Sequence, residues 1–379
     1  MSNKQINILY VFGSGRSDRI KDNEIQTEEF FYGYFNIKKE YKNTDFIEMK
    51  NEVKPERFSQ SILLFFDKVF RKLTNLPFYM NLICTKENYK KISKADKIIA
   101  TNDRLGLSIL PMVLFIRFKK KVELNIIVMG LFSKKKNLIT SIFQKVFYGI
   151  IFKSINKFIF LGLGELNEAK KEFKKYQHKF IFLPFCVDSN FWKNNNKASE
   201  SLDTVLFLGN DGNREFSKVV EIARKMSHIN FKFVTSHNFK KEELPKNVSY
   251  VKANWNENIL SDKDIKNFYI DAKITILPLI DSFQPSGQSV SLQSMAMGTP
   301  VLITKTKGFW DSDNFKNNEN IFFVENNEID SWVESIKLIY NNQELLDTVA
   351  QNGIKLIRDK YNLKFFNDNL ERILFLNNK

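Results

Sequence analysis

The stretch from Leu277 to Gly308, LPLIDSFQPSGQSVSLQSMAMGTPVLITKTKG, decides the fold of this chain. It opens at the end of an apolar run that is typical of a buried strand, and a loop with proline and glycine follows. We expect a helix to begin near Ser289, to end at Gly298 and to lead into a strand over 300–303. A strand, a helix and a second strand in this order indicate a parallel sheet covered by helices.

The beginning of this helix is also the first candidate site. Ser286 and Gly287 precede the helix, where unpaired backbone N–H groups and the positive end of the helix dipole meet. Such an end suits a diphosphate. Ser289 would serve equally well as an N-cap, so the residues alone leave a purely structural role open.

The same alternation of strand-like and helix-like runs occupies both halves of the chain. Strands are predicted at 6–12, 97–101, 122–128, 158–161, 180–183, 204–208, 231–235, 248–251, 274–278, 300–303 and 321–324. Helices are predicted between them, among others at 58–73, 138–152, 165–176 and 214–227. We therefore predict an α/β protein with two doubly wound, Rossmann-like parallel sheets, whose ligands bind beyond the carboxyl ends of the strands in a cleft between the domains.

The 379 residues suit two domains, and the polar run 193–200 is the natural linker. We predict an N-terminal acceptor-binding domain over 1–188 and a donor-binding domain over 189–360. A C-terminal helix over 361–379 is expected to pack back toward the first domain.

The net excess of positive charge lies entirely in the first half. Residues 1–190 hold 34 Lys and Arg against 19 Asp and Glu, whereas residues 191–379 hold 24 of each. Ten basic residues and a single acid, Glu123, lie in the stretch 110–160. The basic half indicates an anionic partner, such as a membrane surface or a phosphate-bearing acceptor, although a solvated basic face with no partner is the plain alternative. The helices at 58–73 and 138–155 mix Phe, Ile and Leu with Lys, as interfacial helices do.

Several other classes of protein are disfavoured. The two cysteines, Cys84 and Cys186, and the three histidines have no metal-ligand spacing, so neither a zinc site nor a disulfide framework is indicated. The longest uncharged apolar run, Leu105 to Ile116, is too short for a membrane span and contains Pro111. No signal peptide pattern precedes the first strand.

The decisive stretch resembles the signature of the retaining GT-B glycosyltransferases called family 4, or glycosyl transferases group 1. The resemblance is carried by Ser286–Val290, Leu292–Ala296, Gly298 and Pro300–Val301. Similar blocks occur in the family's order at 183–192, 206–214, 267–278 and 319–324, and the resemblance covers about residues 180–362. It implies a GT-B fold and transfer of a sugar from a nucleotide-sugar.

One departure from the family concerns charge. The family commonly has two glutamates eight positions apart, where this chain has Pro285 and Gln293. The amide of Gln293 can still bond ribose hydroxyls, but without charge. Arg214 is expected to clamp the diphosphate and to offset the charge of the leaving nucleotide, with a solvated helix residue as the alternative. The predicted donor-binding residues are Gly209, Asn210, Arg214, Gln284, Ser286, Gly287, Gln288, Ser289 and Gln293.

The acceptor side is less well marked. We expect it at the ends of two N-terminal strands, formed by Gly13, Gly15, Arg16, Asp103 and Arg104. The family often has a histidine here, but residues 1–177 contain none. We expect the carboxylate of Asp103 to take its place as the partner of the acceptor hydroxyl. The predicted catalytic residues are thus Arg214, Gln293 and Asp103, with no cofactor and no metal.

The sequence therefore predicts a hexosyltransferase that moves a sugar from a nucleotide-sugar to a glycan or lipid-linked acceptor. We expect retention, a cytoplasmic location on the inner face of the membrane, and a role in polysaccharide, lipopolysaccharide or glycolipid synthesis. A non-catalytic sugar-nucleotide-binding scaffold is the alternative. Nucleic-acid binding through the basic half is a third reading, but no nucleic-acid motif supports it, and we expect none.

Overall fold

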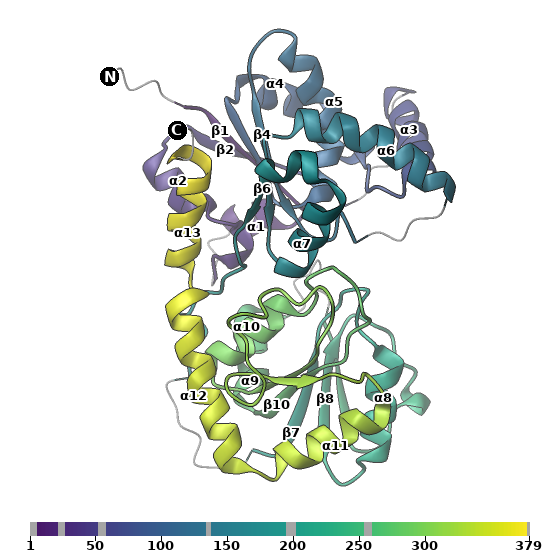
Figure 1. Cartoon of the computed structure of the whole chain (residues 1–379), viewed down its shortest axis with the longest axis vertical. Coiled ribbons are helices and arrows are strands. Elements are labelled where there is room, and N and C mark those ends of the chain that lie inside the picture. The colour runs from purple at the N-terminus through teal and green to yellow at the C-terminus, as the bar shows by residue number, and fades with distance from the viewer. Residues whose placement is uncertain are drawn as a thin grey trace. The chain divides into compact units, whose positions relative to one another are not determined.

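The computed structural model describes residues 6–21, 27–51, 58–133, 138–194, 202–253 and 260–376. The chain divides into two compact units, one of residues 1–25, 30–183 and 369–379 and the other of residues 26–29 and 184–368. Each unit contains one six-stranded sheet with helices around it (Figure 1). The predicted fold class, with two parallel α/β sheets, is confirmed.

The sheet of the first unit has the strand order β2-β1-β3-β4-β5-β6, and every pair in it is parallel. Its strands are β1 Ile8–Phe12, β2 Thr44–Glu48, β3 Lys97–Ala100, β4 Glu123–Val128, β5 Lys157–Phe160 and β6 Phe180–Phe182. The central strands β1 and β3 are buried along their whole length, which explains their continuous apolar runs. The edge strand β2 was not predicted.

Helices of the first unit follow its strands. They are α1 Arg16–Lys21, α2 Tyr34–Glu40, α3 Phe58–Thr74, α4 Lys86–Lys94, α5 Asp103–Arg117, α6 Leu138–Ser154 and α7 Leu163–Glu172. The apolar run with Pro111 forms most of α5. Among the described residues, no helix has the length and apolar character needed to cross a membrane.

The sheet of the second unit has the order β12-β11-β10-β7-β8-β9, again parallel throughout. Its strands are β7 Thr204–Leu208, β8 Asn230–Thr235, β9 Val248–Lys252, β10 Ala272–Leu277, β11 Val301–Thr304 and β12 Phe322–Val324. Its helices are α8 Phe216–Lys225, α9 Asp262–Ile270, α10 Gln288–Ala296, α11 Ile329–Tyr340 and α12 Gln343–Lys360. Because the strands are parallel, the loops that follow them share one edge. Residues 195–200 of the expected linker lie outside the described residues.

The chain ends in α13, Leu363–Glu371, and a helical turn over Arg372–Leu376. Residues from Asn369 onward belong to the first unit. There, Lys97 Nζ donates to the carbonyl of Leu374 at 2.5 Å, and the ring of Phe375 stacks on Tyr41 at 4.2 Å. Lys157 donates to the carbonyl of Ile373. Two lysines thus donate hydrogen bonds to carbonyl groups of the last helical turn, where cations are favoured.

Candidate functional site

Helix α10 begins without a side-chain cap. Its N-cap is Gly287, which has φ +80° and makes no side-chain hydrogen bond to the first turn. Ser289 is therefore the second residue of the helix, and its reading as the N-cap is wrong. Only a residue without Cβ adopts this left-handed conformation at little cost, so the loop delivers bare backbone to the helix start.

The helix itself is held rigidly in the second unit. Eight of its nine residues are buried. The hydroxyl of Ser294 lies 2.8 Å from that of Thr275 on β10, and Gly298, at φ +80°, ends the helix as predicted. A helix fixed on all sides keeps its N-terminus in one place, which is what a binding site for a rigid anion requires.

Arg214 lies against this helix start. Its side chain is 2% exposed, and a Cβ added at Gly209 would lie 2.4 Å from its Nε, so a side chain at position 209 would displace the guanidinium. A Cβ at Gly287 would lie 3.4 Å from its Nη1. Because α8 begins only at Phe216, the alternative of a solvated helix residue is wrong for Arg214. The structure thus brings Arg214, Gly209 and Gly287 together.

The electrostatics of Arg214 are unusual for a buried cation. Its Nη1 forms an ion pair with Oδ2 of Asp211 at 3.0 Å, but among the described residues neither Nη1 nor Nε makes a hydrogen bond. Burial lowers the pKa of the guanidinium, and the Asp211 carboxylate opposes that shift. A buried donor without an acceptor is costly, and a phosphate oxygen would satisfy it.

The two loops on either side of Arg214 are bonded to each other. Glu215 N donates to the carbonyl of Pro278 at 3.0 Å, and Ile280 N donates to the carbonyl of Asn213 at 2.9 Å. Asn213 Nδ2 donates to Oγ of Ser286 at 2.6 Å. The hydroxyl of Ser286 keeps its own proton to donate. The loops after β7 and β10 therefore form one polar surface.

Gln284, Gln288 and Asn210 hold different places on that surface. Gln284 is half-buried in the loop before α10, and its carbonyl accepts from Ser286 N at 2.8 Å. Gln288 is the buried first residue of the helix. Asn210 Oδ1 accepts from Ser236 N at 2.5 Å and its Nδ2 donates to the carbonyl of Ala253 at 3.1 Å, so it ties the loops after β8 and β9 to its own. A direct contact between Asn210 and the nucleotide-sugar stays a prediction.

Gln293 contacts a carboxylate that the sequence did not reveal. Its Nε2 donates to Oε1 of Glu29 at 3.1 Å, and its Oε1 accepts from the hydroxyl of Tyr269 at 3.2 Å. Trp192 Nε1 donates to the same oxygen of Glu29 at 2.6 Å. The second unit therefore does hold a buried carboxylate beside position 293, and it is supplied by Glu29.

Glu29 is fully buried, and this changes its ionisation. Burial raises the pKa of Glu29 from 4.5 to about 7, and the hydrogen bonds from Trp192 and Gln293 oppose the rise only in part. The carboxyl group therefore titrates near neutral pH. The ribose contact predicted for Gln293 stays a prediction, since both ends of its amide already have partners in the protein.

In the first unit, the loop after β1 carries part of the predicted acceptor side. Gly15 has φ +86°, and Arg16 begins α1. The carboxylate of Glu48, at the end of β2, accepts from Arg16 N at 3.0 Å and from Ser17 N at 2.9 Å. Gly13 follows the strand directly and has open space where a Cβ would stand. The start of α1 is thus already bonded to an anionic side chain.

Asp103 and Arg104 lie at the next strand end, in the first turn of α5. Asp103 is buried, and its Oδ1 accepts from Met129 N at 3.0 Å. Arg104 is exposed, with its guanidinium carbon 4.0 Å from the centre of the Tyr79 ring. Asp103 therefore links α5 to the loop after β4, and its contact with an acceptor hydroxyl stays a prediction.

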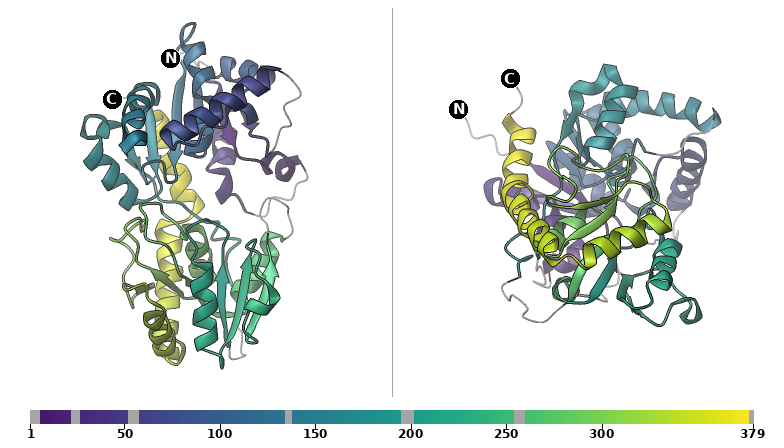
Figure 2. Two further views of the ribbon diagram at one scale, coloured as in Figure 1. Left: turned by 90° about the vertical axis from the view of Figure 1, so that its right-hand side faces the viewer. Right: turned by 60° about the horizontal axis from the view of Figure 1, so that its bottom comes forward.

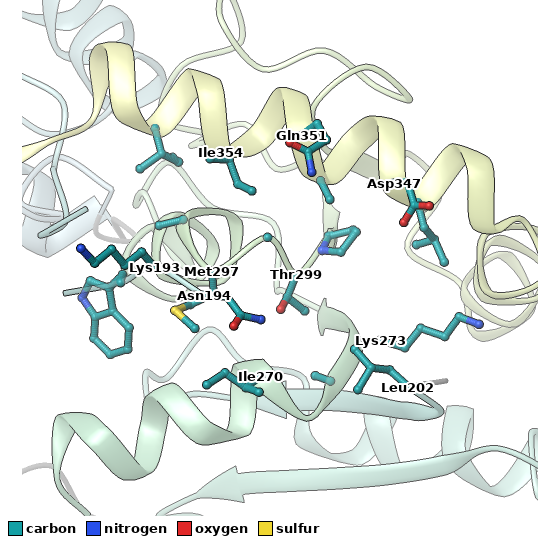
Figure 3. Close-up of a pocket in the computed structure, with 18 of the residues that line it drawn as sticks. Lys193, Asn194, Leu202, Ile270, Lys273, Met297, Thr299, Asp347, Gln351 and Ile354 are labelled. Atoms are coloured by element: carbon teal, nitrogen blue, oxygen red, sulfur yellow. The ribbon is translucent and has the colours of Figure 1, made fainter. Parts of the chain in front are cut away.

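A separate cavity of about 930 Å³ lies at the amino ends of the strands of the second sheet, away from the loops that follow the strands (Figure 3). Ala272 and Pro300 mark the amino ends of β10 and β11 in its wall, and Gln351 and Ile354 of α12 cover it. None of its lining residues belongs to the predicted donor set. Among the described residues, no group of three or more His, Cys, Asp or Glu has a metal-binding arrangement.

Comparison with known proteins finds a family match within the second unit. Residues 235–356, which include α10 and the loop before it, match the family pattern described as "Glycosyl transferases group 1". The match covers about a third of the chain. That domain match covers Gln284 to Gln293, whereas Gly209 and Arg214 lie before it.

A match in sequence to another protein extends the comparison. The chain is 24% identical over 225 residues to the capsular polysaccharide biosynthesis glycosyltransferase CapM of Staphylococcus aureus, covering 57% of this chain and 54% of that protein. The alignment thus spans about half of the relative's length.

The similarity to solved structures extends over nearly the whole chain, further than the sequence match does. The Anabaena protein HepE in complex with UDP-glucose has a TM-score of 0.67 at 11% identity, covering 97% of this chain and 99% of that one. A glycosyltransferase from Rickettsia africae has a TM-score of 0.64 at 13% identity, covering 99% and 100%. At such identities the likeness establishes the fold alone, and the predicted GT-B fold is confirmed.

Proposed function

We propose that this protein is a glycosyltransferase that moves a hexosyl group from a nucleotide-sugar to a glycan or lipid-linked acceptor. The observation that carries the proposal is the buried guanidinium of Arg214 beside the uncapped start of α10. Cation and helix end together favour a diphosphate. The group 1 domain match and the UDP-glucose bound by HepE support a nucleotide-sugar as the ligand.

The chemistry we infer needs little from a protein base. The nucleoside diphosphate leaves the sugar, and the negative charge that develops on it is offset by Arg214 and the backbone N–H groups of α10. We expect Ser286, Gln284 and Gln288 to position the nucleotide-sugar. We propose retention at the transferred carbon and no requirement for a metal, with Asp103 as the partner of the acceptor hydroxyl.

The likeness to a capsular polysaccharide enzyme supports a place in the synthesis of a cell-surface glycan. We propose that the acceptor is reached at an anionic membrane surface on the cytoplasmic side. The excess of basic residues in the first half of the chain supports this partner.

The test is a panel of nucleotide-sugars, each measured for thermal stabilisation of the full chain and then for release of nucleoside diphosphate. Mass action predicts a clear shift for the true donor, since a ligand at a hundredfold its Kd stabilises by about 2.7 kcal/mol. The matched free nucleoside diphosphate should shift the protein as well. No shift with any member of the panel would refute the donor site.

A non-catalytic scaffold is the second candidate, and the hydrogen bonds of Gln293 favour it. Both ends of its amide are bonded within the protein, to Glu29 and Tyr269. Stabilisation by a nucleotide-sugar without any turnover, in the presence of glycan and lipid-linked acceptors, would support this candidate over the enzyme.

A further inference from the structure

Helices α3 and α6 of the first unit pack against each other and lie side by side in Figures 1 and 2. The ring of Phe70 on α3 lies 5.3 Å from that of Phe147 on α6, and Gln144 Nε2 donates to the carbonyl of Thr74 at 2.7 Å. These contacts use one face of each helix. A second face of each helix is left outside the core.

That outer face is apolar, although it is exposed. Phe65 and Val146 are each 62% exposed, which is unusual for side chains of this size. Six exposed apolar residues form stripes at helical spacing: Ile62, Phe65 and Phe66 on α3, and Ile142, Val146 and Ile150 on α6. Phe143 on α6 is exposed as well. Several exposed apolar side chains on two adjacent helices mark a place where a fold contacts a partner.

The charges beside the stripes all have one sign. Lys68, Lys72, Lys145 and Lys153 are exposed on the same two helices. The sole acidic residue in these helices is Asp67, which is buried and accepts hydrogen bonds from Met80 N and Asn81 N. Exposed Phe and Ile with lysines, and with no exposed carboxylate, are the pattern of a helix that lies in a lipid interface. Lys134, Lys135 and Lys136 of the basic stretch lie outside the described residues.

We propose that the α3–α6 surface, defined by these six apolar residues and four lysines, docks on an anionic lipid bilayer. The apolar stripes enter the boundary between headgroups and acyl chains, while the lysines contact lipid phosphates. A second copy of the chain fits the surface less well, because a twofold interface would bury the lysines of both copies with no exposed carboxylate of these helices to pair them. The inference rests on the membrane association proposed above. Vesicle binding is measured without a nucleotide-sugar, so its failure is distinct from a failure of sugar transfer.

The experiment is flotation of the full chain with vesicles of phosphatidylcholine alone and of an equimolar mixture with phosphatidylglycerol. We expect binding to the mixed vesicles that is at least about tenfold tighter than to phosphatidylcholine. Lys68→Gln with Lys145→Gln should weaken binding to the mixed vesicles by about 25-fold, since each lysine contributes about fivefold. Phe65→Ser with Val146→Ser should weaken binding to both vesicle types by about tenfold or more.

Matched controls come from α11 and α12 of the second unit. Leu338→Ser removes a side chain that is 74% exposed, and Lys337→Gln with Lys355→Gln removes two exposed lysines. Both controls should bind like the natural chain. Equal binding to the two vesicle types, or controls that weaken binding as much as the surface variants, would overturn the proposal. So would a dimer that Phe65→Ser with Val146→Ser dissociates while vesicles bind neither form.

Discussion

The two units present a helix start at the carboxyl edge of a parallel sheet, and the neighbours of these two starts have opposite charge. In the first unit, the N–H groups of Arg16 and Ser17 at the start of α1 bond the carboxylate of Glu48. In the second unit, the start of α10 has no side-chain cap and the guanidinium of Arg214 lies against it. The helix N-terminus therefore already has a carboxylate partner in the first unit, whereas in the second unit it is open to an anion.

The difference teaches which residues make a helix end into a binding site. A helix N-terminus favours negative charge, and Glu48 already supplies it for α1, so a second anion there would meet repulsion. At α10 a cation adds to the positive end of the helix instead. Four predictions break or sharpen this contrast, and they run from the largest expected effect to the smallest.

Removal of Arg214 should have the largest effect. In Arg214→Ala we expect kcat/KM for nucleotide-sugar turnover to fall about 100- to 1000-fold, because one preorganised donor to a developing anion contributes about 3–4 kcal/mol. Arg214→Lys keeps the charge without the planar fork and should be intermediate. The measurement is release of nucleoside diphosphate at varied donor concentration.

The control for Arg214 is Arg224→Ala, on the exposed side of α8. Arg224 pairs with Glu221 and donates to the carbonyl of Glu243 at the surface, and such pairs contribute at most about 1 kcal/mol. Its turnover should equal that of the natural chain. If folded Arg214→Ala and Arg214→Lys both keep full turnover, the start of α10 is not the site of the leaving group.

The second prediction concerns the pair Gln293 and Glu29. Gln293→Glu would set a second carboxylate beside Oε1 of Glu29, which Gln293 Nε2 now contacts at 3.1 Å. Loss of the donated hydrogen bond and repulsion between buried like charges should lower the free energy of unfolding at pH 8 by about 3–4 kcal/mol. The exchange Glu29→Gln with Gln293→Glu restores one amide and one carboxylate and should recover most of that loss. Additive effects in the double-mutant cycle would contradict a direct contact.

The third prediction is a pH dependence that Glu29 imposes on stability. The folded-state pKa of Glu29 is about 7 and the ordinary value is 4.5, so between these values the folded chain binds more protons than the unfolded chain. Stability from this group is therefore greatest below pH 4.5, falls as pH rises toward 7, and is level above it. The fall should be about 3 kcal/mol, since one pH unit corresponds to about 1.4 kcal/mol.

Glu29→Gln should abolish this component. Urea unfolding of both chains at pH 5 and pH 8 measures it as the difference between their pH dependences. Other carboxyl groups cancel in that difference. An identical pH dependence in the two chains would show that Glu29 does not titrate in the folded state near neutral pH.

Much of the fold could be predicted because buried parallel strands have continuous apolar sequences, as β1 and β3 do. The edge strand β2 was not predicted because its sequence TDFIE has alternating, partly polar positions and no apolar run. The start of α10 was placed one residue late, since the decisive feature is the positive φ of Gly287 rather than a serine side chain. The strands were therefore predicted where both faces are buried and missed where one is exposed, whereas the start of α10 depends on a backbone angle that the side-chain pattern does not report.

The site was partly predictable for a similar reason. Arg214 and Gly287 lie in loops after neighbouring strands of one parallel sheet, so their proximity follows from topology. Glu29 lies 264 positions before Gln293 and belongs to no motif. Its contact depends on the path of the chain through tertiary structure, for which neither spacing nor composition gives a signal.

The smallest effect tests the closed helix start of the first unit. In Glu48→Ala the N–H groups of Arg16 and Ser17 lose their acceptor, which should cost about 1 kcal/mol of stability, the usual contribution of a capping side chain. Glu48→Gln keeps one acceptor oxygen and should cost less. Neither change should alter donor affinity, because Glu48 belongs to the other unit. If inorganic phosphate raises the melting temperature of Glu48→Ala more than that of the natural chain, an anion has taken the place of the carboxylate, and the two helix starts differ in their neighbours alone. If phosphate stabilises both chains equally, the start of α1 does not accept a free anion even when vacant, and the contrast with α10 lies in the backbone as well.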